Sequence, residues 1–171
     1  MRSRHPAAVS LGLAAALALA APGLADAPPA APQVTVASGA LAGVRDGDVV
    51  SFKGVPFAAP PVGDLRWRPP RPAAPWKGVR PADKVGPLCQ QKYNAGDNGV
   101  GPLPMSEDCL TLNVFAPADA KALPVMVWIH GGGFVNGSGT AALYDGSALA
   151  RQGVVVVTIN YRLGRFGFFA H

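Results

Sequence analysis

The residues with the clearest chemical potential are the three consecutive glycines in HGGGF, at positions 130–134. The HGGGF segment directly follows the apolar run VMVWI at residues 125–129, so its glycines should lie where a buried strand ends. Glycine lets the backbone turn sharply and leaves N–H groups uncovered by side chains. Converging N–H donors of this kind stabilise the oxyanion of a tetrahedral intermediate in acyl transfer. Taken alone, the motif is equally consistent with a tight turn between a strand and a loop.

Acyl transfer through a covalent intermediate also needs an activated nucleophile. A serine nucleophile is typically presented by the sequence Gly-x-Ser-x-Gly. Ser51, Ser106, Ser138 and Ser147 lack the two flanking glycines of that pattern. His130 precedes the three glycines and is expected to orient the loop rather than to abstract a proton. The sequence therefore predicts an oxyanion site without its own nucleophile.

The N-terminus has the pattern of a secretory signal. Arg2 and Arg4 precede an apolar run at residues 7–20, and small residues follow it. This run is shorter than the roughly 20 residues that a membrane-spanning helix needs. We predict a signal peptide at residues 1–25, followed by an Ala/Pro-rich leader and first strand at residues 26–38. An uncleaved N-terminal anchor is the alternative. A cleaved signal predicts a secreted or periplasmic protein with no integral membrane segment.

Export makes the two cysteines informative. Cys89 and Cys109 lie 20 positions apart and are the only cysteines of the chain. An even pair in an oxidising compartment favours a disulfide, and two buried free thiols are the alternative. Because no histidine pair lies near them, we predict no metal site.

Composition excludes several classes of protein. The length of 171 residues suits one domain. The 21 glycines and 18 prolines argue against a coiled coil or a helical bundle, because both residues break helices. The formal charge of +5 comes from scattered lysines and arginines without a basic run, so no nucleic-acid partner is predicted.

The elements that must position the glycines can be read from the pattern of apolar residues. Short β-prone runs at residues 33–37, 41–45 and 49–52 are separated by Ser-Gly and Asp-Gly turn signals. They predict an antiparallel meander at the start of the domain. A further strand is predicted at residues 110–115.

The pattern then changes to that of an α/β protein. The apolar runs at residues 125–129 and 154–159 flank a short predicted helix at residues 147–151. Strand, crossover and strand in this order indicate an α/β fold. A strand that is apolar on both faces implies a parallel or mixed sheet covered on both sides.

Several longer stretches resemble the type-B carboxylesterases, the cholinesterase-like family. They are FKGVPFA at residues 52–58, PPVG at 60–63, LRWRPP at 65–70, EDCLTLNVFAP at 107–117 and NYRLG at 160–164. The resemblance follows the family's order. It implies the N-terminal portion of an α/β-hydrolase fold over residues 39–171, in which an antiparallel meander leads into a mostly parallel central sheet that is incomplete here.

The resemblance also assigns roles around the glycines. The oxyanion-hole donors would be the N–H groups of Gly132 and Gly133, with a third donor from the residue after the nucleophile. Phe134 would line the floor of the site or the acyl pocket, or simply pack. The nucleophile, the acid and the catalytic histidine would follow the NYRLG region and are absent from this chain.

Two further features carry over from the family. Cys89 and Cys109 match its first disulfide loop, and Arg66 and Glu107 match a salt bridge that braces this loop. In cholinesterases the loop holds a tryptophan that binds the cationic choline head, whereas residues 90–108 contain none. Choline esters are therefore not indicated.

The function implied by the resemblance is hydrolysis of a small-molecule carboxylic ester through an acyl-serine intermediate, without a cofactor. The chain would be an N-terminal fragment that holds the oxyanion-hole loop but not the triad, and it would be inactive alone. The alternative is a catalytically inactive, cholinesterase-like secreted binding or adhesion protein. A natural truncation or a pseudogene product is a third possibility.

Overall fold

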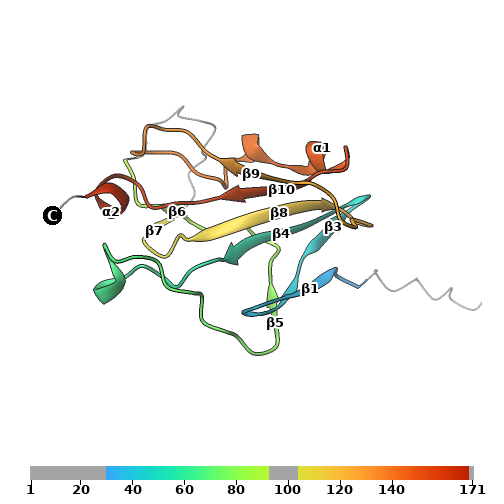
Figure 1. Ribbon diagram of the computed structural model, residues 1–171, viewed down its shortest axis with the longest axis horizontal. Helices are drawn as coiled ribbons and strands as arrows, with labels where there is room; N and C mark the ends of the chain where they lie inside the picture. Colours follow the sequence, from blue (N-terminus) through green and yellow to red (C-terminus); the bar gives the residue numbers. More distant parts are fainter. Residues whose placement is uncertain (1–29, 93–103, 170–171) are drawn as a thin grey trace, which may run out of the picture.

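The glycine-rich segment is carried by a five-stranded mixed sheet (Figure 1). The strands of this sheet are β3 (Val44–Asp46), β4 (Val49–Pro56), β8 (Thr111–Pro117), β9 (Val125–Ile129) and β10 (Val155–Ile159). Their order is β3-β4-β8-β10-β9. The structure is a computed structural model that describes residues 30–92 and 104–169. The predicted signal peptide lies outside the described residues.

Strands β9 and β10 are parallel and in register, with Val125 opposite Val155 and Ile129 opposite Ile159. The chain crosses between them through the 3-10 helix η2 (Ala142–Tyr144) and the helix α1 (Ser147–Ala150). The strand, helix and strand expected from the apolar runs are thus confirmed. The other pairs of the described sheet, β3–β4, β4–β8 and β8–β10, are antiparallel. Parallel pairing in this sheet occurs at the β9–β10 end.

The N-terminal strands form two hairpins in separate sheets rather than one continuous meander. β1 (Gln33–Val36) pairs antiparallel with β2 (Gly39–Ala42), and β2 pairs parallel with β5 (Val79–Pro81). The predicted strand at residues 41–45 is broken at Gly43, where a Cβ atom would collide with the Ser51 carbonyl oxygen. This close approach lets the chain leave the small sheet and enter the five-stranded one.

Four short elements complete the described chain. They are η1 (Gly63–Leu65), β6 (Leu88–Cys89), β7 (Met105–Ser106) and α2 (Gly164–Phe168). β6 and β7 form a two-stranded parallel sheet. In Figure 1, α2 lies at the side of the sheet where β9 and β10 end, so that side collects the segments that follow both strands.

One face of the five-stranded sheet is covered by the η2–α1 crossover. The buried cluster on this face consists of Val49, Phe115, Ala150 and Val156. A separate cluster joins the small sheet to β4 and β8 and includes the half-buried Trp76, whose indole N–H donates to the Ala40 carbonyl at 2.8 Å. Burial of this apolar surface stabilises the described part of the fold by the hydrophobic effect.

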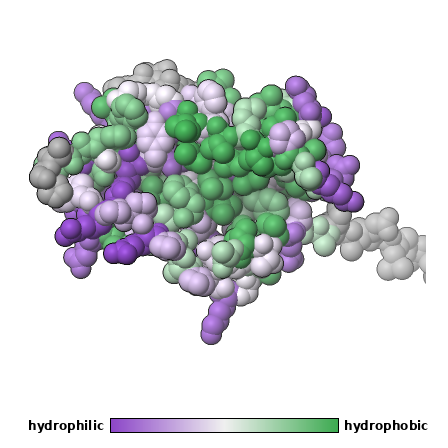
Figure 2. Space-filling model, viewed as in Figure 1, coloured by the Kyte–Doolittle hydropathy of each residue, from purple (hydrophilic) through white to green (hydrophobic). Residues whose placement is uncertain are grey.

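Strand β9 lies at the edge of the sheet and all five of its residues are exposed, which corrects the expectation of cover on both sides. The side chains of Val125, Val127 and Ile129 are 63%, 54% and 64% exposed. Figure 2 shows apolar side chains gathered over the region of β9 and β10. The physical reason is that no described segment packs over Val125, Val127 and Ile129. On the other face Trp128 contacts Tyr144 of η2, with ring centroids 5.2 Å apart, but it is still 42% exposed.

Candidate active site

The three glycines begin a loop at the carboxyl end of β9, next to its parallel neighbour β10. Gly132 and Gly133 have φ angles of +119° and +59°, in the region that favours glycine. A Cβ atom on Gly132 would collide with the carbonyl oxygen of Asn136, so no side chain fits there. The N–H groups of Gly132 and Gly133 donate to no group among the described residues. The loop thus presents two neighbouring free donors at an open sheet edge.

Phe134 follows the glycines and also has a left-handed backbone, with φ of +64°. Such a conformation is uncommon for an aromatic residue and often marks a functional loop. Its ring is 60% exposed and lies 4.7 Å from the ring of Phe168 in α2. Its carbonyl oxygen accepts a hydrogen bond from the Gly164 N–H at 2.7 Å. The tip of the loop is therefore held by the segment that follows β10.

His130 lies beneath the loop rather than at its open surface. The side chain is 3% exposed, and Nδ1 lies 2.8 Å from the Gly131 carbonyl oxygen. Because a carbonyl can only accept, Nδ1 carries the proton and Nε2 is left as a buried acceptor, with no partner among the described residues. Burial lowers the pKa of His130 below its ordinary value. The imidazole is thus kept neutral.

Tyr161 braces the start of the loop from the segment after β10. Its ring stacks on the His130 ring, with centroids 4.2 Å apart and planes 12° apart. Its hydroxyl donates to the His130 carbonyl oxygen at 2.6 Å. Burial raises the pKa of the Tyr161 hydroxyl, so this group stays a donor at neutral pH. These contacts suit two residues that hold the loop in place.

Beyond its tip, the loop passes into a buried stretch held by asparagine side chains. Asn160 accepts from the Ser138 hydroxyl at 2.9 Å and the Gly139 N–H at 3.0 Å, and donates to the Pro87 carbonyl at 3.0 Å. Asn113 donates to the Gly139 carbonyl at 3.2 Å. It also accepts from the N–H of Gly54 at 3.0 Å, where β4 is irregular opposite β8. Both asparagine side chains are nearly fully buried, and in each the amide oxygen accepts and the amide nitrogen donates a hydrogen bond.

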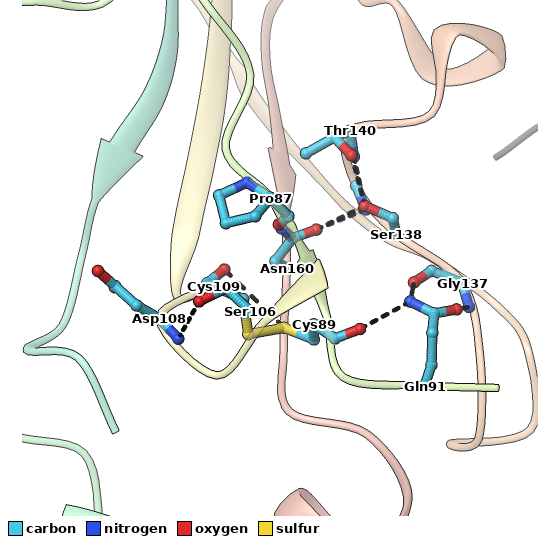
Figure 3. Close-up of a disulfide and its surroundings, with 11 residues drawn as sticks. Pro87, Cys89, Gln91, Ser106, Asp108, Cys109, Gly137, Ser138, Thr140 and Asn160 are labelled. Carbon is cyan, nitrogen blue, oxygen red and sulfur yellow. Dashed lines mark hydrogen bonds between the residues drawn. A yellow bond between two sulfur atoms is a disulfide. The ribbon is translucent and has the colours of Figure 1, made fainter. Parts of the chain in front are cut away.

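The Cys89–Cys109 disulfide lies beside this stretch (Figure 3). Gln91 follows two residues later, and its side-chain amide bonds to both the N–H and the carbonyl of Gly137. The disulfide-closed segment and the glycine-rich loop are therefore in direct contact.

Arg66 and Glu107 form the ion pair expected from the resemblance, and the contact is bidentate. Arg66 Nε and Nη2 lie 2.5 and 2.6 Å from the two carboxylate oxygens of Glu107. The hydrogen bonds from Arg66 lower the pKa of the Glu107 carboxyl, and the same contact raises the pKa of the guanidinium. Glu107 is thus kept ionised near Cys109. An ionised carboxylate suits a structural ion pair, whereas a general acid needs a proton to donate.

The described serines offer no exposed nucleophile next to the loop. Ser138 is buried, and its hydroxyl is bonded to Thr140 and Asn160. The Ser106 hydroxyl accepts from the N–H of Asp108 at 3.0 Å. Among residues 30–92 and 104–169, no group of histidine, cysteine and acidic side chains could hold a metal ion.

Sequence reasoning located the glycines, the cysteines and the ion pair but missed the residues that hold the loop. Asn113, Asn160 and Tyr161 fall within the family-like stretches, where their presence alone suggested no role. Gln91 lies outside those stretches, and no signal in the sequence indicated it. Within the part of the chain that the structure describes, no helix is long and apolar enough to cross a membrane.

Comparison with known proteins adds to this geometry. A family model described as "Carboxylesterase family" matches residues 30–171. The chain is 54% identical over 138 residues to the fumonisin B1 esterase of Sphingopyxis macrogoltabida, covering 78% of this chain and 25% of that protein. It is 50% identical over 138 residues to the para-nitrobenzyl esterase of Bacillus subtilis, covering 79% and 28%. A solved thermophilic PNB esterase superposes with a TM-score of 0.77 at 46% identity, covering 81% of this chain and 29% of that one. The chain thus spans about a quarter of the length of the curated relatives it matches.

Proposed function

The chain belongs to the carboxylesterase family and has the α/β-hydrolase fold, and from this premise we propose that it is the N-terminal part of a serine esterase. The observation that carries the proposal is the pair of N–H groups at Gly132 and Gly133, which lie in the loop after β9 and donate to no described residue. Donors fixed in this way can meet the oxygen that becomes negative when a carboxylic ester is attacked. The proposed reaction is hydrolysis of a small-molecule ester.

In the proposed mechanism, a serine hydroxyl attacks the ester carbonyl carbon and gives its proton to a histidine. A C–O bond forms, and the carbonyl oxygen becomes an oxyanion that accepts hydrogen bonds from the Gly132 and Gly133 N–H groups. Collapse of the intermediate expels the alcohol, which takes the proton from the histidine. Water then releases the acid from the acyl-serine by the same steps, and the loop serves both tetrahedral intermediates.

We place the serine and its histidine in a further part of the polypeptide. The buried, bonded state of Ser138 supports this placement, as does the greater length of the relatives. The position of β9 at the end of the described strand order supports it too, because an exposed apolar edge strand favours pairing with another strand. We propose that a strand from that further part pairs with β9. The Cys89–Cys109 disulfide supports export to a secreted or periplasmic location.

The test is to sequence the gene past the codon for His171, and to express the full product and residues 26–171 separately. Hydrolysis of p-nitrophenyl acetate and butyrate, with labelling by a serine-reactive fluorophosphonate, is measured for both. We expect saturable hydrolysis and labelling in the full product and neither in the shorter chain. A soluble, monomeric 26–171 chain with inhibitor-sensitive hydrolysis would contradict the placement of the nucleophile. A folded full product without turnover or labelling would instead favour a secreted binding or adhesion protein.

A further inference from the structure

Gln91 makes an unusual set of contacts for a half-buried glutamine. Its Oε1 accepts from the Gly137 N–H at 2.8 Å, and its Nε2 donates to the Gly137 carbonyl at 2.9 Å and the Cys89 carbonyl at 3.1 Å. Figure 3 shows this amide between the disulfide and the end of the glycine-rich loop. We propose that Gln91 is a positioning residue that clamps Gly137 and so fixes the oxyanion loop to the disulfide-bonded segment. This inference rests on the proposed function of Gly132 and Gly133.

Gly137 is well placed to transmit the position of Gln91 to the loop. It is buried and has a φ of +111°. A Cβ atom there would collide with the Gly131 carbonyl and the His130 ring, so its backbone packs directly under the start of the loop. Because no space separates Gly137 from the Gly131 carbonyl and the buried His130 ring, a shift of Gly137 toward them would displace Gly131. The N–H groups of the next two residues would then lose their alignment.

The other end of the clamp is rigid. Cys89 is 2% exposed, pairs with Ser106 in the β6–β7 sheet and is joined covalently to Cys109. A glutamine suits the position because its amide both donates and accepts, as the two backbone groups of Gly137 require. Glutamate could only accept when ionised, and methionine has no donor and only a weakly accepting sulfur.

The fold itself depends on other groups in this region. Asn160 and Asn113 hold Ser138 and Gly139 independently of Gln91. Loss of the Gln91 amide should therefore change the geometry of the loop while the buried stretch after it stays folded. This separation makes a positioning role measurable.

The experiment compares Gln91→Met and Gln91→Glu with wild type in the full-length protein. Gln90→Met is the matched control, because the Gln90 side chain makes no hydrogen bond to a described residue. Steady-state kinetics on p-nitrophenyl butyrate are combined with hydrogen exchange of the peptide that spans residues 131–140. We expect kcat to fall about 10- to 100-fold in Gln91→Met with KM changed less than about twofold, since only alignment in the transition state is lost. Exchange at residues 131–140 should accelerate in Gln91→Met, and at least as much in Gln91→Glu, because its ionised carboxylate would face the Gly137 and Cys89 carbonyl oxygens.

The outcomes separate this inference from the proposed function. If Gly133→Pro lowers kcat about 10²- to 10³-fold while Gln91→Met keeps the wild-type kcat and exchange, Gln91 does not position the loop. If Gln91→Met alters KM as much as kcat, or if Gln90→Met has the same effect, the positioning role is also wrong. A wild-type protein without turnover would overturn the proposed function, and unchanged exchange in Gln91→Met would independently overturn the clamp.

Discussion

The loop tip at residues 131–136 and the stretch at residues 137–140 are adjacent in sequence but opposite in character. The tip is largely exposed, contains three consecutive left-handed residues and leaves two N–H donors free of described partners. In the following stretch all four residues are buried, and side chains from three separate segments bond to its polar groups.

This difference indicates how an open donor site can be kept in shape. Free N–H groups contribute little to folding, so a loop that keeps them free must be positioned by its neighbours. The anchors lie in distant parts of the chain: Gln91 near the disulfide, Asn113 in β8, and Asn160 and Tyr161 after β10. Changes at the tip should therefore affect turnover, and changes at the anchors should affect stability or alignment.

The largest expected effect follows from removing a donor at the tip. Gly132→Pro or Gly133→Pro in the full-length protein deletes one N–H and forbids the positive φ. We expect kcat to fall about 10²- to 10³-fold, with a smaller effect on the unfolding midpoint because the tip is exposed. Gly47→Pro is the control, because Gly47 has a φ of +57° in a distant turn. Equal esterase rates in folded wild type and variant would show that the N–H at that position does not stabilise the oxyanion.

The next effect concerns stability at the buried stretch. Asn160→Leu removes three hydrogen bonds. The buried Gly139 N–H and the half-buried Pro87 carbonyl lose their side-chain partner, whereas the Ser138 hydroxyl keeps Thr140. We expect a loss of about 3 kcal/mol or more in the free energy of unfolding, measured by denaturant titration. Gln152→Leu on the exposed surface should change it by less than about 0.5 kcal/mol. An Asn160→Leu protein as stable as wild type would show that the hydrogen bonds of Asn160 do not stabilise the buried stretch at residues 137–140.

A comparable effect is expected from the disulfide. Replacing Cys89 and Cys109 by serine opens a loop with a sequence separation of 20, which should cost about 3 kcal/mol of stability. Mass spectrometry of a non-reduced digest of exported protein should first show the linked peptides. Two alkylatable free thiols in that material would contradict the bond, and unchanged stability in the double variant would contradict its contribution.

The smallest expected effect is a pH dependence from His130. Because burial lowers its folded pKa, the unfolded chain binds the proton more readily below the ordinary value of 6.5. The free energy of unfolding should therefore be highest above this pH and decrease as the pH falls below it. Glu107, whose folded pKa is also lowered, loses its contribution only below its ordinary value of 4.5.

Denaturant titrations from about pH 8 to about pH 5 measure this slope in wild type and in His130→Asn. The variant should show a flatter profile across this range. Equal slopes in both proteins would mean that His130 titrates normally in the folded state.

A feature could be predicted from the sequence when the residues that cause it are close together along the chain. The parallel pair β9 and β10 was predictable because two continuous apolar runs flank a short helix, a pattern written in consecutive residues. The break at Gly43 was not, because it depends on the Ser51 carbonyl approaching from the next hairpin. The cover of β9 was predicted wrongly because an apolar strand indicates what a face requires and not which segment supplies it.

For the site, the sequence by itself supplied the candidate residues: three glycines shortly after an apolar run, a cysteine pair, and stretches specific enough to identify the family. The anchors of the loop were decided only by the tertiary structure. Gln91 and Gly137 are 46 positions apart, and Asn160 and Pro87 are 73 apart. A hydrogen bond depends on distance and direction in space, whereas a motif records only order along the chain. An amide side chain such as that of Gln91 therefore acquires its role when the fold brings a backbone N–H and a carbonyl to it.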